Sequence, residues 1–64
     1  MYEVTNKRVI NMHCAFAVKT PDEVFELVKE FSEDEKLAKK ISTWCKNTAP
    51  GKVYNSKLVE VKTV

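Results

Sequence analysis

Three side chains in the 64-residue sequence have the chemistry of nucleophiles, bases or metal ligands: His13, Cys14 and Cys45. Catalysis needs such a group within hydrogen-bond reach of its partner, but alternation along a strand would point His13 and Cys14 to opposite sides. Structural zinc takes four Cys or His ligands, and only three are present. A glycine-rich phosphate loop is excluded as well, because Gly51 is the single glycine. The sequence therefore predicts a non-enzymatic protein that holds no metal or cofactor, with His13 at the surface.

The two cysteines leave two interpretations open. As free thiols they would be small buried hydrophobes, which is the usual habit of free cysteine, and we favour this interpretation. The alternative is a single Cys14–Cys45 bridge, which falls short of a disulfide framework. The N-terminus lacks the features of a signal peptide, and no apolar run is long enough to cross a membrane. We therefore expect a cytoplasmic protein with reduced cysteines and no membrane partner.

The charged residues are strongly segregated along the chain, although the net charge is only +2. Residues 1–20 carry a balance of +2, residues 21–35 a balance of −6, and residues 36–64 a balance of +6. A nucleic-acid-binding domain is usually basic overall, so this pattern does not by itself indicate one. The segregation is the main functional clue in the sequence.

Asp22, Glu26 and Glu30 form what we call the acidic ridge, because they follow one another at i, i+4 on an expected helix. Like charges at this spacing destabilise a helix by roughly 0.2–0.5 kcal/mol per pair, so a positive group nearby would offset the repulsion. One interpretation is internal: lysines of the second helix or the last strand balance the ridge. The other is a basic patch on a partner protein, steered in by opposite charge. On the second interpretation the acidic ridge is a protein-binding site.

The expected second helix carries four lysines on one side, which we call the lysine face: Lys36, Lys39, Lys40 and Lys46. Such a face could follow a phosphate backbone with salt-dependent, largely sequence-neutral affinity. It contains no arginine for bidentate contact with guanine and no aromatic residue to stack on bases. Nucleic-acid binding is therefore an alternative function, and a solvated helix face is the simpler interpretation.

Residues 9–19 alternate in the way that a half-buried strand does. The side expected to face the core holds Ile10, Met12, Cys14, Phe16 and Val18. The opposite side holds Val9, Asn11, His13, Ala15 and Ala17. Its two alanines make the opposite side flat, so it either meets water, as one face of an antiparallel sheet often does, or packs against another chain. We therefore regard the five residues of this side as a candidate homodimer face.

A helix-start signal, the capping box, occurs twice in the middle of the chain. Thr20 stands three residues before Glu23, and Ser32 stands three residues before Glu35. Apolar positions recur at helical spacing after each box. The pattern predicts two helices over residues 21–31 and 33–47.

The break at Ser32 decides the topology. A helical hairpin returns the chain to the end it left, so that the next strand runs antiparallel to residues 9–19, whereas one continuous helix would give a parallel strand through a right-handed crossover. The doubled capping box favours the hairpin. Residues 52–64 are again typical of a strand, with a bulge or bend at Asn55-Ser56. We predict one α+β domain over residues 1–64, of order β(β)ααβ, with the two helices on one face of a mainly antiparallel sheet of two or three strands.

The functional prediction is a small protein-binding module, a regulator or inhibitor that docks on another protein through a charged helix face or a sheet edge. A nucleic-acid-binding protein that uses the lysine face is the first alternative. The second is a homo-oligomeric structural module joined through the candidate homodimer face.

Overall fold

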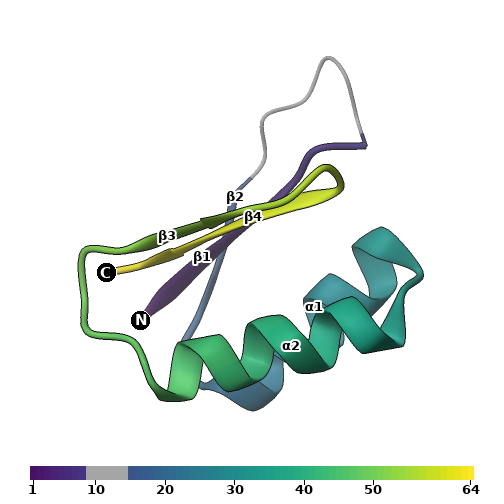
Figure 1. Ribbon diagram of the computed structural model, residues 1–64. Helices are drawn as coiled ribbons and strands as arrows, with labels where there is room; N and C mark the ends of the chain where they lie inside the picture. The colour runs from purple at the N-terminus through teal and green to yellow at the C-terminus, as the bar shows by residue number, and fades with distance from the viewer. Residues whose placement is uncertain (9–14) are drawn as a thin grey trace.

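Residues 1–8 and 15–64 are described by the computed structural model of the chain (Figure 1). They form an α+β domain, as predicted, with two helices and an antiparallel sheet of four strands. The elements in chain order are β1 Tyr2–Asn6, β2 Ala15–Val18, α1 Pro21–Ser32, α2 Glu35–Lys46, β3 Val53–Asn55 and β4 Val59–Thr63. The order is therefore ββααββ, with one more strand after the helices than the sequence predicted.

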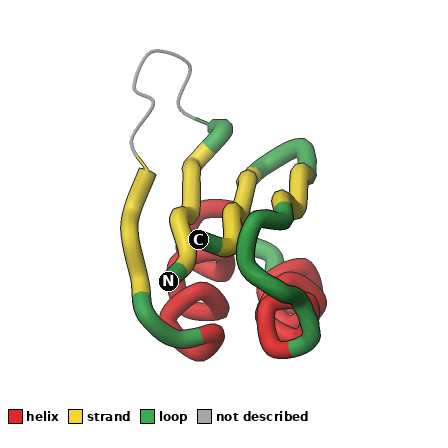
Figure 2. The backbone as a smooth tube through the Cα atoms, turned by 90° about the vertical axis from the view of Figure 1, so that its left-hand side faces the viewer, coloured by secondary structure: helices red, strands yellow, loops and turns green. Residues whose placement is uncertain are grey.

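The strand order in the sheet is β2-β1-β4-β3, so β2 and β3 are the edge strands. Every neighbouring pair is antiparallel, and consequently β3 runs opposite to β2. This direction confirms the helical hairpin, which returns the chain to the end of the sheet that β2 left. Both helices cover the same face of the sheet, and no described element covers the other face (Figure 2).

The core lies between the helix layer and the covered face of the sheet. Directly opposite residues in neighbouring strands share a face, and Val4 stands opposite Phe16 of β2 and Val61 of β4. The buried apolar side chains are Val4, Val24, Val28, Ala38, Ile41, Cys45, Val59 and Val61. The sheet contributes valines to this set, which suits strands because β-branched side chains fit a pleated, half-buried surface.

The start of α1 is the one that the sequence predicted. The Thr20 hydroxyl accepts a hydrogen bond from the Glu23 N–H at 3.2 Å and lies 3.3 Å from the Glu23 carboxylate. Asp22 and Glu23 occupy the first turn, where the helix dipole favours negative charge. Thr20 therefore fixes where the chain leaves β2 and turns beneath the sheet.

The break between the helices is built from Glu33 and Asp34, which corrects the predicted cap at Ser32. Ser32 is the last residue of α1, and its buried hydroxyl donates to the Val28 carbonyl at 2.6 Å. Glu33 follows in the left-handed conformation, with φ 56°, a common way for a helix to end. Asp34 then caps α2 by accepting from the Leu37 N–H at 3.1 Å. Ser and Asp are almost equally good caps, so the sequence alone did not separate the two positions.

Residues 52–64 form two strands, where the sequence predicted one strand with a bulge or bend. The Ser56 hydroxyl accepts from the Val59 N–H at 3.1 Å and donates to the Val59 carbonyl at 2.7 Å. These bonds close a turn, so the chain reverses at the position where an irregularity was expected. β4 then lies between β1 and β3, which makes it a central strand.

Candidate functional site

Hydrogen bonds between the backbones at the two ends of β1 and β4 show in which direction the backbone N–H and C=O groups of β2 point. The Lys7 N–H donates to the Leu58 carbonyl at 2.9 Å, and the Val64 N–H donates to the Met1 carbonyl at 2.9 Å. Met1 and Lys7 therefore point their backbone groups toward β4. Because directions alternate along an antiparallel strand, the odd-numbered residues of β1 all point toward β4 and the even-numbered residues toward β2.

This alternation places the backbone groups of Ala15 and Ala17 on the outer edge of the sheet. Val4 is even-numbered and stands opposite Phe16, so Phe16 directs its N–H and C=O toward β1. Ala15 and Ala17 flank Phe16 and direct theirs away from the sheet. We call these outward groups of Ala15 and Ala17, with Phe16 between them, the β2 edge.

The four residues of β2 include no charged side chain and no proline, although Lys19 directly follows them. Edge strands are commonly protected by charged side chains, by proline or by a covering element. β2 reads Ala-Phe-Ala-Val, and its first three residues are exposed. In Figure 2 it is the outermost strand on the left, with no described element beyond it. Within residues 1–8 and 15–64, the outward groups of the β2 edge are therefore available for strand addition.

Phe16 supplies an apolar contact directly beneath this edge. It projects to the helix-covered face, since it stands opposite the buried Val4. Its ring centroid lies 5.4 Å from that of Phe31 in α1, with the ring planes at 43°. Phe16 nevertheless remains 46% exposed. An exposed aromatic side chain at the border of the core is the type of residue that contributes most when a partner covers it.

The opposite edge, formed by β3, is better protected. The Thr63 N–H donates to the Lys52 carbonyl at 2.9 Å, so alternation directs the backbone groups of Val53 and Asn55 outward. However, β3 has three residues and Lys52 directly precedes it. Short length discourages pairing, and Lys52 flanks β3 in the same way that Lys19 flanks β2.

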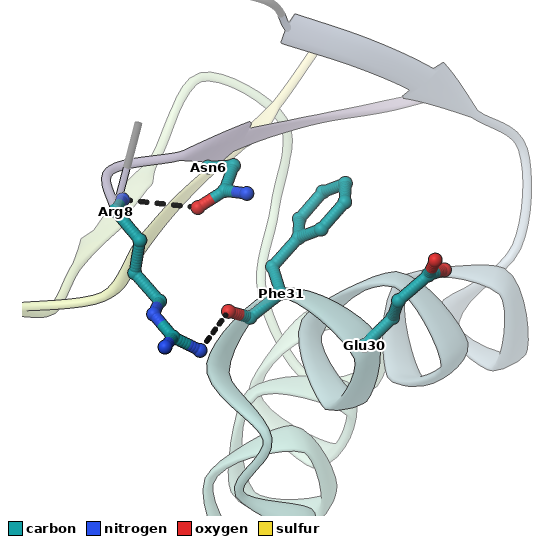
Figure 3. A pocket seen from close by; sticks show the side chains of 4 residues that line it. All are labelled: Asn6, Arg8, Glu30 and Phe31. Carbon is teal, nitrogen blue, oxygen red and sulfur yellow. Dashed lines mark hydrogen bonds between the residues drawn. The ribbon is translucent and has the colours of Figure 1, made fainter. Parts of the chain in front are cut away.

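A shallow hollow opens at one end of the sheet, lined by Asn6, Arg8, Glu30 and Phe31 (Figure 3). The Arg8 guanidinium donates to the Phe31 carbonyl at 3.1 Å and lies 3.5 Å from the Glu33 carboxylate. The Asn6 side chain accepts from the Arg8 N–H at 2.9 Å. These bonds tie the turn after β1 to the end of α1, so the Asn6 and Arg8 side chains of the hollow have structural partners.

The acidic ridge and the lysine face lie where helical spacing predicts, on the outer sides of α1 and α2, and all seven residues are exposed. Within residues 1–8 and 15–64, one ion pair forms, between Arg8 and Glu33. No ion pair in this part of the chain joins the acidic ridge to the lysine face. The internal interpretation of the ridge therefore has no ion pair to support it in this part of the chain. Binding of a protein by the ridge, or of nucleic acid by the lysine face, stays a prediction.

The candidate homodimer face is described only at Ala15 and Ala17, which are exposed and project from the uncovered face of the sheet. Val9, Asn11 and His13 lie outside the described residues, as does Cys14. Cys45 is a free, buried thiol, and burial raises its pKa from 9.0 to about 11. A thiol with a raised pKa is a poor nucleophile, which is consistent with a buried structural cysteine.

The direction of the β2 backbone groups is the feature that sequence reasoning missed. The alternation of apolar and polar residues assigned side chains to the two faces of the sheet. It did not show which residues of β2 form backbone hydrogen bonds with β1. The uncharged run Ala-Phe-Ala-Val was the available signal, because an unprotected edge strand has this composition.

No described helix is both long and apolar enough to cross a membrane. Comparison with protein family models, curated proteins and solved structures finds no match for the chain.

Proposed function

We propose that this chain is a small, non-enzymatic protein-binding module that docks by adding a strand of its partner to the β2 edge. The observation that carries the proposal is the outward direction of the Ala15 and Ala17 backbone groups, inferred from the bonds at the ends of β1. In strand addition, main-chain hydrogen bonds provide affinity and side-chain contacts provide specificity. We propose that, by occupying a strand of its partner in this way, the module regulates or inhibits that partner.

Phe16 supplies the side-chain contact that such docking needs. An added strand would place one side chain beside Phe16 on the helix-covered face, where the ring is half exposed. That side chain would extend the Phe16–Phe31 aromatic contact. The proposal therefore favours a partner strand with an apolar residue at this position, flanked by residues whose side chains meet the flat surface of the two alanines.

Selection from a displayed library of unstructured peptides tests the proposal. Ala17→Pro removes an N–H that points away from the sheet, and proline is tolerated at such positions. The matched control is Val53→Pro, which makes the same change at the outward position of β3. We expect the wild-type chain and Val53→Pro to enrich the same extended peptides, and Ala17→Pro to bind them about tenfold more weakly or worse, as expected from a lost hydrogen bond and a strained docking geometry.

Amide hydrogen exchange of the wild-type chain with a selected peptide completes the test. Binding should slow exchange at Ala15 and Ala17. Failure to enrich any peptide, or enrichment that Ala17→Pro leaves unchanged, would contradict the proposal.

A further inference from the structure

We infer that the β2 edge takes a second copy of this chain, paired antiparallel about a twofold axis that passes between the two copies of Phe16. This inference rests on the proposed function, because both use the same edge. It names the partner and the register.

The register follows from the two faces of the sheet. In an antiparallel pair about a twofold axis perpendicular to the sheet, opposed residues lie on the same face, so the axis must pass between two copies of one residue. With the axis at Phe16, Ala15 of each copy stands opposite Ala17 of the other. All four alanines direct N–H and C=O outward, so both pairs are hydrogen-bonded pairs. Each copy thus satisfies the outward groups of the other.

The same register covers the exposed side of the Phe16 ring, which packs against Phe31 on its other side. Phe16 stands opposite its own copy in a non-hydrogen-bonded pair, where Cα atoms approach to about 4.5 Å and side chains are closest. Both rings are on the helix-covered face, each 5.4 Å from its own Phe31. The second copy therefore brings apolar side chains to the exposed side of each Phe16 ring.

No charge of β2 itself opposes self-pairing at this edge. β2 contains no charged residue, so two identical edges meet without opposed like charges. Two acidic ridges, or two lysine faces, would repel each other. The net charge of +2 also leaves little long-range repulsion between copies.

Pairing between two copies of β2 gives a closed dimer, whereas pairing of β2 with β3 does not. A twofold contact uses the same edge on both copies and stops at the dimer, whereas β2 of one copy on β3 of the next would continue as a filament. The three-residue β3, which is shorter than β2, disfavours the second arrangement.

The contact is small, so we expect a weak dimer. Stable interfaces bury about 800 Å² on each partner, which is a large share of the 4462 Å² total surface of this chain. A four-residue edge with one aromatic side chain covers less than that. The dimer should therefore form with rising concentration and exchange with the monomer, and a foreign strand would compete with the second copy.

Analytical ultracentrifugation of the purified chain over about 10 μM to 1 mM, the range suited to weak association, tests the dimer. We expect the average mass to rise from monomer toward dimer. Ala17→Pro should raise the dissociation constant about tenfold or more, because each copy loses one of the donors at the contact, while Val53→Pro should leave it unchanged. Thermal unfolding of each variant confirms that the domain is folded.

Two double variants test the register. Ala15→Lys/Ala17→Lys places like charges opposite each other across the proposed contact, whereas Ala15→Glu/Ala17→Lys places opposite charges there. At low salt the second should dimerise more strongly than the first by about threefold to tenfold. Equal dissociation constants would overturn the Phe16-centred register.

The outcomes separate this inference from the proposed function. A strictly monomeric wild-type chain that still binds selected peptides through Ala17 overturns the dimer and leaves strand addition standing. A dimer that Ala17→Pro does not weaken also overturns the inference, since the contact would then lie elsewhere on the chain.

Discussion

α1 and α2 each have 12 residues and begin with a side-chain cap, yet they contribute to the fold in different ways. α1 packs against β1 and β4 as well as against α2, whereas α2 packs chiefly against α1. The sheet meets α2 through side chains: the Trp44 and Tyr54 rings lie 5.3 Å apart, and the Tyr2 hydroxyl donates to the Cys45 carbonyl at 3.5 Å. α1 therefore makes the closer backbone contact with the sheet, and α2, on the same face, contacts the sheet through side chains.

The buried residues of the two helices reflect these positions. α1 buries Val24 and Val28, which are β-branched and meet the valines of the sheet, together with Ser32. α2 buries the small residues Ala38 and Ser42, next to Ile41 and Cys45. Small side chains let two helices approach closely, whereas larger ones fill the space below the sheet. The comparison implies that α2 depends on α1 more than α1 depends on α2.

Truncation of Ile41 should have the largest effect. Ile41 is fully buried in α2, and Ile→Ala in a core costs about 2–5 kcal/mol. A core in a domain of this size supplies only about 3–5 kcal/mol, so Ile41→Ala should leave the domain largely unfolded at 25 °C. Ile41→Val should cost about 0.5–1.5 kcal/mol and remain folded. Circular dichroism without urea detects the unfolding of Ile41→Ala, and urea unfolding monitored by circular dichroism measures the stability of Ile41→Val.

Urea unfolding also tests whether α2 depends on α1. If α2 is part of one cooperative unit with α1, Trp44 fluorescence and far-ultraviolet circular dichroism should change together. A Trp44 transition at clearly lower urea, with most of the circular dichroism retained, would show that α2 detaches while α1 holds the sheet.

The next largest effect comes from Cys45, which makes the contribution of α2 to stability depend on pH. It is buried in α2 and its pKa is raised to about 11 by burial, whereas the buried residues of α1 do not titrate. The folded state therefore holds the thiol proton to a higher pH than the unfolded chain, whose pKa is near 9.0. The contribution of the neutral thiol is complete below pH 9 and is lost as the pH rises from about 9 to about 11, by roughly 2–3 kcal/mol in total.

Cys45→Ala isolates this contribution from every other effect of high pH on stability. Subtracting the stability curve of Cys45→Ala from that of the wild type should leave a difference that is flat to pH 9 and then falls. A difference that stays flat to pH 11 would mean that the thiol ionises as easily in the folded chain as in the unfolded one.

Much of the fold could be predicted from the sequence, because its strongest signals are local. The Thr20 cap and the helical periodicity that follows it set α1, and the hairpin direction follows from the break near residue 33. The cap of α2 was misplaced by two residues because Glu33 takes a left-handed conformation without being glycine, and nothing in its residue type announces this. The turn at Ser56 was predicted only as a bulge or bend. It is closed by the Ser56 N–H, which donates to the Val59 carbonyl at 3.0 Å, as well as by the Ser56 hydroxyl.

The candidate site was harder to predict, because it depends on pairing between distant strands. The acidic ridge and the lysine face follow directly from helical spacing, and they lie on the surface as expected. The β2 edge requires knowing that β1 lies between β2 and β4 and which of its residues bond to each. Hydrogen-bond direction along a strand is set by register, which is a tertiary property.

Reversing one charge on each helix gives the smallest effect and tests whether the two charged surfaces influence each other. Glu30→Lys in α1 replaces a repulsive i, i+4 contact with Glu26 by an attractive one and places a positive charge near the end of the helix. Lys36→Glu replaces the repulsive i, i+4 contact between Lys36 and Lys40 in α2 by an attractive one. It also places a negative charge near the start of that helix. Each should stabilise the domain by roughly 0.5–1 kcal/mol at low salt, measured by urea unfolding, and the gain should shrink with added salt. Because no described ion pair joins the two helices, the double variant should give the sum of the two single effects. A sum that fails by more than about 0.5 kcal/mol would show that the ridge and the lysine face are electrostatically coupled after all, and the ridge would then have its positive partner within the chain.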